Sequence, residues 1–326
     1  MADRQLDLDF AKGLLVALMV VYHTMNYFAS IDAAYYGYLR FVNGSFVFLA
    51  GYTVALFYAP QDQRPRTAVS GRLLTRGAKL LAIFTVLNLA ILLLGVTSYR
   101  KVDPAGADLA GSIVAMYGTG HSDRMAFRIL APIAYVLLLA PIYLGARRLR
   151  QLLILMTIVA AACLPWGGLE APHLFFLLTG LVGLSMGLLL AGRSLPPIRS
   201  LPLIAVGFLA LAAAMNTLSG NVLAYSIGIA LMLKLILDFA GAIDLQQPLT
   251  RVIRLMGRYS LPCYIVQIGL LFVLYKLLPG QRWPLGGQLL LIVAAINALL
   301  VAMCWGLARA RREYRWAEKT YAFVFA

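Results

Sequence analysis

The N-terminal segment reads FAKGLLVALMVVYHTMNYF from Phe10 to Phe28, and Lys12 is its only side chain that is charged at neutral pH. An α-helix needs roughly 20 predominantly apolar residues to cross the hydrocarbon core of a bilayer. The segment has about that length and lacks the small-residue cleavage site of a secretory signal peptide. We therefore expect it to be a retained transmembrane helix.

Runs of the same kind recur to the end of the chain. Of its 326 residues, 62% are hydrophobic and 13% charged, whereas soluble domains are about half apolar and a quarter charged. No linker rich in Gly, Ser or Pro divides the sequence, so we expect one domain, residues 1–326. The sequence predicts an all-α polytopic membrane protein with about ten spans, at 10–28, 37–59, 78–97, 127–146, 151–166, 172–191, 201–217, 221–240, 259–278 and 286–308.

Basic residues collect in every second loop, after the second, fourth, sixth, eighth and tenth spans. Because Lys and Arg mark the cytoplasmic side, both termini are predicted to be cytoplasmic, in a multi-pass protein of the cytoplasmic (inner) membrane. The same alternation argues against nucleic acid as the partner of the +15 net charge, since the cations do not gather on one soluble face. Membrane lipids are the expected partner of the basic, aromatic tail from Arg309 to Tyr321.

Two further segments bear on a site. The longest outer loop, from about Ser98 to Arg124, either covers an acceptor site or is a solvated connector. The three cysteines have no metal-ligand spacing and no partners in loops, which favours buried small side chains and predicts no metal site. The residues concerned are Asp103, Asp108, His121, Asp123 and Arg124 in the loop, and Cys163, Cys263 and Cys304.

Ionisable side chains inside a membrane are costly, so each is a candidate for function. Lys12 and His23 are eleven residues apart, which places them on nearly the same helix face and about 16 Å apart along the axis. His23, with Asn26 one turn away, could act as a general base on an attacking hydroxyl. The alternative is a core histidine hydrogen-bonded to a neighbouring helix.

Other polar residues have weaker signals. Glycines beside Asn43 suit close helix packing, and Arg40 either meets an anionic acceptor or snorkels to the interface. Lys234 and Asp238, four residues apart, either neutralise each other or line a polar cavity. A basic cluster either clamps donor phosphates or only sets the orientation of the protein. The cluster is Arg72, Arg76 and Lys79, and the remaining candidates are Ser260 and Gln267.

Three segments together resemble the acyltransferase-3 family of membrane acyltransferases. The family's first helix carries an arginine, ten intervening residues and a catalytic histidine, and Lys12 and His23 stand at those positions, with Asp9 three residues earlier. The segment from Phe46 to Tyr52 is similar to the family's Phe-rich helix, followed by a basic segment at Arg72 to Arg76. The segment from Met256 to Tyr264 is similar to its Gly-x-x-Ser-Tyr-x-x-Tyr helix start.

The resemblance implies an enzyme that moves an acyl group, acetyl or succinyl, from cytoplasmic acyl-CoA to a hydroxyl of a periplasmic or cell-surface glycan. The sequences of the second and ninth spans are especially similar to those of OpgC-type glucan succinyltransferases, and heparan-type acetyltransferases are a more distant likeness. His23 would be the base, acyl-CoA a co-substrate with no permanently bound cofactor, and a polysaccharide synthesis or export system a candidate partner. Two departures are Lys12 in place of arginine and Gln267 in place of a late histidine.

Two other functions fit the same spans. The first is a transporter or flippase for a glycan or lipid-linked saccharide, with Lys234, Asp238 and His23 lining its path. The second is a non-catalytic membrane partner of a polysaccharide-export assembly. Consumption of a thioester by the purified protein distinguishes the enzyme from the transporter, because a transporter leaves the donor intact.

Overall fold

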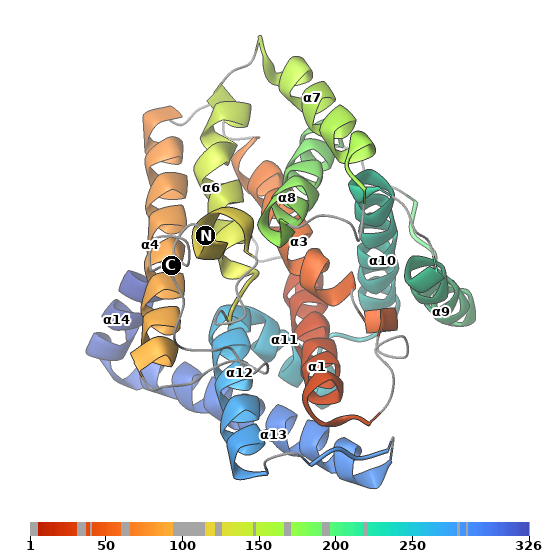
Figure 1. Cartoon of the computed structure of the whole chain (residues 1–326), viewed down its shortest axis with the longest axis vertical. Helices are drawn as coiled ribbons and strands as arrows, with labels where there is room; N and C mark the ends of the chain where they lie inside the picture. The colour runs from red at the N-terminus through yellow and green to blue at the C-terminus, as the bar shows by residue number, and fades with distance from the viewer. Residues whose placement is uncertain are drawn as a thin grey trace. The chain divides into compact units, whose positions relative to one another are not determined.

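The structure is a computed structural model that describes residues 6–30, 37–39, 41–59, 66–93, 115–120, 126–145, 148–165, 171–190, 196–217, 221–278, 281–284 and 286–325. The described residues are helical without a sheet (Figure 1), which confirms the predicted all-α class. In chain order the elements are α1 (Leu6–Phe28), η1 (Gly37–Leu39), α3 (Phe41–Tyr58), α4 (Arg66–Leu93), η2 (Ala115–Thr119), α6 (Leu130–Gly145), α7 (Arg150–Cys163), α8 (Pro172–Leu189), α9 (Leu201–Thr217), α10 (Val222–Ala242), α11 (Pro248–Arg258), α12 (Ser260–Leu277), α13 (Gly287–Glu313) and α14 (Arg315–Phe325).

Seven of the described helices are long and apolar enough to cross a membrane: α1, α3, α4, α8, α10, α12 and α13. Three shorter apolar helices, α6, α7 and α9, occupy the positions of the remaining predicted spans. The chain is therefore a multi-pass membrane protein with apolar helices at all ten predicted positions. The number of helices that actually cross, and the cytoplasmic placement of the termini, stay predictions.

Two segments predicted as basic loops are helical. α4 begins at Arg66, about twelve residues before the predicted span, because no Pro or polar turn interrupts the chain between Pro65 and the apolar run. The segment after α10 forms α11, which begins at Pro248, where the fixed φ of proline suits the first turn. Its arginines alternate with apolar residues at helical spacing, a pattern typical of an amphipathic helix.

The described helices form two compact units, each assembled from separate stretches of chain. Unit 1 comprises Met1–Asn43, Pro196–Leu218 and Leu231–Ala326, and unit 2 comprises Gly44–Leu195 and Ser219–Ala230. The unit boundaries fall near the start of α3 and within α10. Since neither unit is one continuous stretch, the single domain over residues 1–326 stays a prediction.

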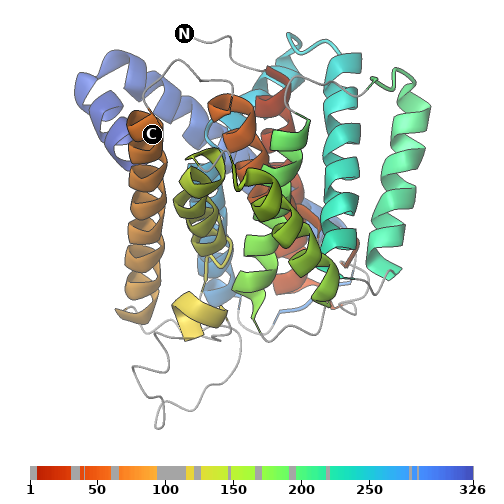
Figure 2. The same ribbon diagram turned by 90° about the horizontal axis from the view of Figure 1, so that it is seen from above.

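In unit 1, α1 packs against α11, α12 and α13. Its contact with α11 joins backbone to backbone: a Cβ atom added at Gly13 would overlap the carbonyl oxygen of Ile253, and one at Gly257 would overlap that of Asp9. Glycines at both positions allow this approach. On another side of the unit, α9 runs alongside α10 in both views, with Gly207 against Leu235 (Figures 1 and 2).

In unit 2, α4 packs mainly on α6, and α8 packs on α6 and α7. The predicted close approach at the glycines of the second span is confirmed. A Cβ atom at Gly51 would overlap the carbonyl oxygen of Gly180 in α8, and one at Gly44 would overlap the ring of Tyr225 in α10. Small residues thus set the packing of α3 within this unit.

The cysteines differ from each other. Cys263 in α12 and Cys304 in α13 are buried, as predicted, and their sulfur atoms lie 3.2 Å apart. Cys163 is exposed at the end of α7, so the prediction of burial is wrong there. The apolar run predicted from 151 to 166 is helical only to residue 163, and its last helical residue faces outward.

Candidate functional site

His23 lies on α1, about one turn before the end of that helix. Its helix is enclosed by three helices of unit 1, α11, α12 and α13, and the flanking residues Val20 and Thr24 are fully buried. The imidazole ring itself is half-buried and meets the Tyr22 ring edge-on, with 5.2 Å between centroids. The packing of α1 against these helices thus fixes the position of the His23 side chain along the bundle.

The Nε2 atom of His23 is enclosed by protein and has no hydrogen-bond partner among the described residues. Most buried side-chain nitrogen and oxygen atoms in proteins are paired, and an unpaired one costs roughly 1–3 kcal/mol. The predicted alternative, a core histidine hydrogen-bonded to a neighbouring helix through this atom, therefore has no support in the described part of the chain. The nitrogen therefore has no hydrogen-bonding role in the packing of the described residues.

Gln267 on α12 is a second side chain of this kind. It is 0% exposed, and both its amide atoms lack a partner within the described ranges. Helices α1 and α12 meet at Tyr27 and Tyr275, whose ring centroids are 5.8 Å apart. Gln267 precedes Tyr275 by eight residues, and Met19 precedes Tyr27 by eight residues. Gln267 therefore lies at about the level of Met19, which is about one helical turn from His23.

The other candidates on these helices are half-buried. Asp9 and Lys12 lie in the first turns of α1, and each takes part in an interaction with another group. Neither Lys12 nor His23 is fully exposed, but their shared cavity stays a prediction. Asn26 near the end of α1 and Ser260 at the start of α12 are half-buried as well.

Lys234 and Asp238 form an ion pair on α10, with 2.6 Å between Nζ and Oδ1. Lys234 Nζ also donates to the carbonyl oxygen of Pro196 at 3.0 Å, and the backbone N–H of Ile198 donates to Asp238 Oδ2 at 3.2 Å. The pair thus holds the segment that precedes α9. These contacts favour structural neutralisation over a polar transport path.

The predicted donor-binding residues lie on α4 in unit 2. Arg72, Arg76 and Lys79 are spaced four and three apart and so share one face of the helix. Arg72 and Arg76 are exposed and Lys79 is half-buried. Arg76 Nη1 donates to the Tyr58 hydroxyl at 2.9 Å, and this contact ties α4 to the end of α3.

Two predicted acceptor-side features fall mainly outside the described residues. The first is the start of the second span: Arg40 lies outside the described residues, whereas Asn43, three residues later, is half-buried on α3. The acidic residues, His121 and Arg124 of the long outer loop also lie outside the described ranges. Of that loop, residues 115–120 are described, as η2 and Gly120.

Sequence reasoning missed His173, at the start of α8. Its Nδ1 lies 3.3 Å from the carbonyl oxygen of Tyr117, and its ring packs against Phe84 and Tyr135, with centroids 6.3 and 6.2 Å away. Gly120, at φ +74°, packs on the same ring, and a Cβ atom there would overlap it. This histidine fastens η2 to the bundle of unit 2. Its rarity, as one of three histidines, was the available signal.

A model of the Acyl_transf_3 family, described as an acyltransferase domain, matches residues 5–309 of the chain. The match includes α1 with His23, the basic face of α4 and the whole of α12. Searches against curated proteins and against solved structures gave no match.

Proposed function

Because the chain belongs to the acyltransferase-3 family, we propose that this membrane acyltransferase uses His23 to move an acyl group from cytoplasmic acyl-CoA to a glycan hydroxyl on the outer side. One observation supports the role of His23 above all: its Nε2 is enclosed in an apolar bundle without a partner among the described residues. A catalytic base needs such an atom, placed where water does not compete for it.

The reaction then follows in two linked steps. His23 Nε2 accepts the proton of the acceptor hydroxyl while the hydroxyl oxygen attacks the thioester carbonyl carbon. The carbon–sulfur bond breaks, and the departing thiolate takes the proton from the imidazolium, so that the products are the acyl ester and free CoA thiol. Nδ1 carries the ring proton throughout, because only the unprotonated ring nitrogen accepts a proton. The proposal gives Gln267, near the same level and without a partner among the described residues, the role of binding a polar group of the acceptor.

The donor is assigned to the basic side of the membrane. Arg72, Arg76 and Lys79 present cations on one face of α4, a pattern suited to the phosphates of the CoA nucleotide. Lys12 stands where the family has an arginine, and a lysine contacts a phosphate as a point charge without the bidentate geometry of arginine. The inner membrane, the glycan acceptor and the choice between acetyl and succinyl donors belong to the same proposal.

The test is turnover by the purified protein. Wild type, His23→Gln and His23→Ala are incubated with acetyl-CoA or succinyl-CoA and a soluble glucan, and both thioester loss and the acylated glucan are measured. We expect saturable donor binding by all three proteins and transfer by wild type alone. Cys163→Ser, at an exposed position, is the matched control and should keep wild-type turnover.

Two results would overturn the proposal. Equal turnover by His23→Gln and wild type would remove the histidine from the chemistry. An intact thioester at millimolar acyl-CoA, with glycan accumulating across a vesicle membrane, would favour the transporter.

A further inference from the structure

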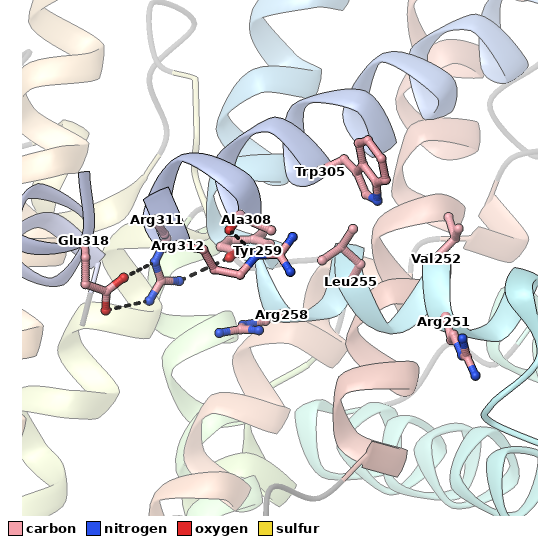
Figure 3. Close-up of a pocket in the computed structure, with 10 residues that line it drawn as sticks. All are labelled: Arg251, Val252, Leu255, Arg258, Tyr259, Trp305, Ala308, Arg311, Arg312 and Glu318. Carbon is pink, nitrogen blue, oxygen red and sulfur yellow. Dashed lines mark hydrogen bonds and ion pairs between the residues drawn. The ribbon is translucent and has the colours of Figure 1, made fainter. Parts of the chain in front are cut away.

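The C-terminal half of unit 1 contains a cavity of about 460 Å³, and none of the predicted site residues is among the described residues that line it (Figure 3). It lies between α11, the end of α13 and α14. One part of its wall is basic and another is apolar. The lining residues are Arg251, Val252, Leu255, Arg258 and Tyr259, followed by Trp305, Ala308, Arg311, Arg312 and Glu318.

Arg311 is already engaged by its neighbours. Its guanidinium donates to Glu318 at 2.6 and 3.0 Å and to the Tyr259 hydroxyl at 3.3 Å, and it lies 3.9 Å from the centroid of the Tyr321 ring. Figure 3 shows the contacts with Glu318 and Tyr259 joining α13 to α14 and to the start of α12. This arginine therefore braces the wall and balances Glu318, the only carboxylate among the described residues that line it.

The other three arginines of the wall have no carboxylate partner in the described part of the chain. Arg312 donates to the carbonyl oxygen of Ala308 on its own helix, Arg258 lies over the Tyr259 ring, and Arg251 is exposed. Three cations thus border one cavity without a direct ion pair, and one of them, Arg258, acts on Glu318 only through its charge, which helps to lower the pKa of that carboxylate. Such a wall suits an anion, and arginine matches the oxygen geometry of phosphate in particular.

The apolar part of the wall continues onto the outer surface of the bundle. Trp305 is 67% exposed, and beyond the cavity α14 exposes Trp316 by 67% and Phe323 by 76%. Amphipathic helices with basic and aromatic residues lie at the boundary between headgroups and acyl chains. The ligand that fits is therefore a phosphate ester that carries a long apolar chain.

Helix α11 separates this cavity from the helix that carries His23. Ile253 and Gly257 face α1, where they contact Gly13. Arg251 and Leu255, each two residues from Ile253, lie roughly on the opposite side of the helix at 100° per residue. A long-chain acyl-CoA and a phospholipid both combine a phosphate with an apolar chain, but the cavity lies on the side of α11 that faces away from α1, and this favours the lipid.

We propose that this cavity binds the phosphate headgroup of an anionic phospholipid from the leaflet on the basic side of the membrane. Arg258 and Arg312 donate to the phosphate oxygens, and one acyl chain lies along Trp305. The bound lipid fastens α11 to α13, next to the brace made by Arg311. The inference goes beyond acyl transfer and is independent of it.

The experiment measures lipid binding to the purified, delipidated full-length protein by native mass spectrometry during titration with phosphatidylglycerol. Replacing both arginines, Arg258→Gln with Arg312→Gln, is expected to weaken the most tightly bound lipid by about tenfold or more. The matched control, Arg148→Gln with Arg199→Gln, removes the same charge at exposed positions outside the cavity and should bind as wild type does.

Three further ligands identify the source of the phosphate. Phosphatidylcholine tests whether binding needs a net negative charge, and glycerol 3-phosphate tests whether it needs the acyl chain. Palmitoyl-CoA tests whether the cavity is instead a binding site for the acyl donor. We expect phosphatidylglycerol to bind most tightly and palmitoyl-CoA not to displace it. Equal binding by phosphatidylcholine, displacement by palmitoyl-CoA, or unchanged lipid affinity of the double variant would each overturn the proposal.

A measurement on the unaltered cavity covers the case in which the double variant fails to fold. In nanodiscs of phosphatidylcholine, a small fraction of brominated phosphatidylglycerol should quench tryptophan fluorescence more than the same fraction of brominated phosphatidylcholine. Trp305→Phe should lose that difference. Equal quenching by the two lipids in wild type would contradict the proposed site.

Discussion

His23 and the Lys234–Asp238 pair are ionisable groups on apolar helices of the same unit, but they differ in their contacts. The pair is hydrogen-bonded to itself and to the backbone at Pro196 and Ile198. The Nε2 of His23 has no partner within the described residues. Both kinds of group are costly inside a membrane, and only the pair recovers that cost through internal contacts.

The difference separates structure from function. A polar group whose partners are all internal stabilises the fold and has no capacity left for a ligand. A group without internal partners weakens the fold unless a ligand completes it, so it is retained where the ligand matters. This difference supports the proposal that His23 and Gln267 belong to the site and that Lys234 and Asp238 belong to the scaffold.

The largest effect is expected at His23. His23→Ala should lower the rate of acyl transfer by a factor of about 10² to 10⁴, the usual contribution of a general base. It should lower the melting temperature only by the lost packing of the ring, because the enclosed nitrogen makes no hydrogen bond to a described residue that would also be lost. Thioester consumption and thermal unfolding measured on one preparation check both parts. A large fall in melting temperature with proportional loss of activity would instead make His23 a structural residue.

The opposite outcome is expected at the ion pair. Asp238→Leu leaves Lys234 without its carboxylate and should lower the free energy of unfolding by about 3 kcal/mol, since breaking a largely buried pair exposes the cost of the remaining charge. Adding Lys234→Met to the same chain should recover most of that loss. Thermal unfolding in one detergent measures both variants. Transfer activity lost in a stable double variant would place the pair in the site.

Gln267 gives a sharper test because it is wholly buried. Gln267→Leu removes two unpaired amide atoms and should raise the free energy of unfolding by about 1–3 kcal/mol. If the amide binds the acceptor, the same change should raise the KM for the glycan several-fold and leave donor affinity unchanged. Initial rates at varied glucan and fixed acyl-CoA separate the two effects. A destabilised variant would mean that Gln267 is satisfied internally.

Much of this molecule could be predicted from its sequence, because its strongest signals are local. Length and apolarity of each run place the ten apolar helices, and an ionisable residue within such a run draws attention to His23. The amphipathic helix α11 was missed because its arginines resemble those of a basic loop, and α4 begins early because charge does not end a helix.

The contacts between helices were not predictable in the same way. The approach of Gly13 to Gly257 and the adjacency of Cys263 and Cys304 join residues far apart in the chain. Single residues of these types carry no signal that names their partner. The basic cavity is a further case, since Arg258 and Arg312 come from helices separated by the whole of α12. Sequence thus indicated which residues are unusual, and packing decided which of them have partners.

The smallest effect is expected at the ion pair between Arg311 of α13 and Glu318 of α14. The carboxylate of Glu318 accepts hydrogen bonds from Arg311. This contact, helped by the charges of Arg311 and Arg258, lowers the pKa of Glu318 below its usual value of 4.5. A lowered pKa in the folded state means that the contribution to stability is complete above pH 4.5 and is lost as the pH falls through the lower, folded value.

Acidification below pH 4.5 should therefore loosen α14 from α13 without unfolding the bundle. Hydrogen exchange in α14 should accelerate in wild type as the pH falls, after correction for the intrinsic rate. Glu318→Gln should show the faster exchange already at neutral pH, and Glu313→Gln, which removes the exposed partner of Arg309 on α13, is the matched control. The change should be small, because exposed ion pairs contribute little. An exchange rate in α14 that is the same in wild type and Glu318→Gln at every pH would show that the Arg311 brace depends on the Tyr259 and Tyr321 rings alone.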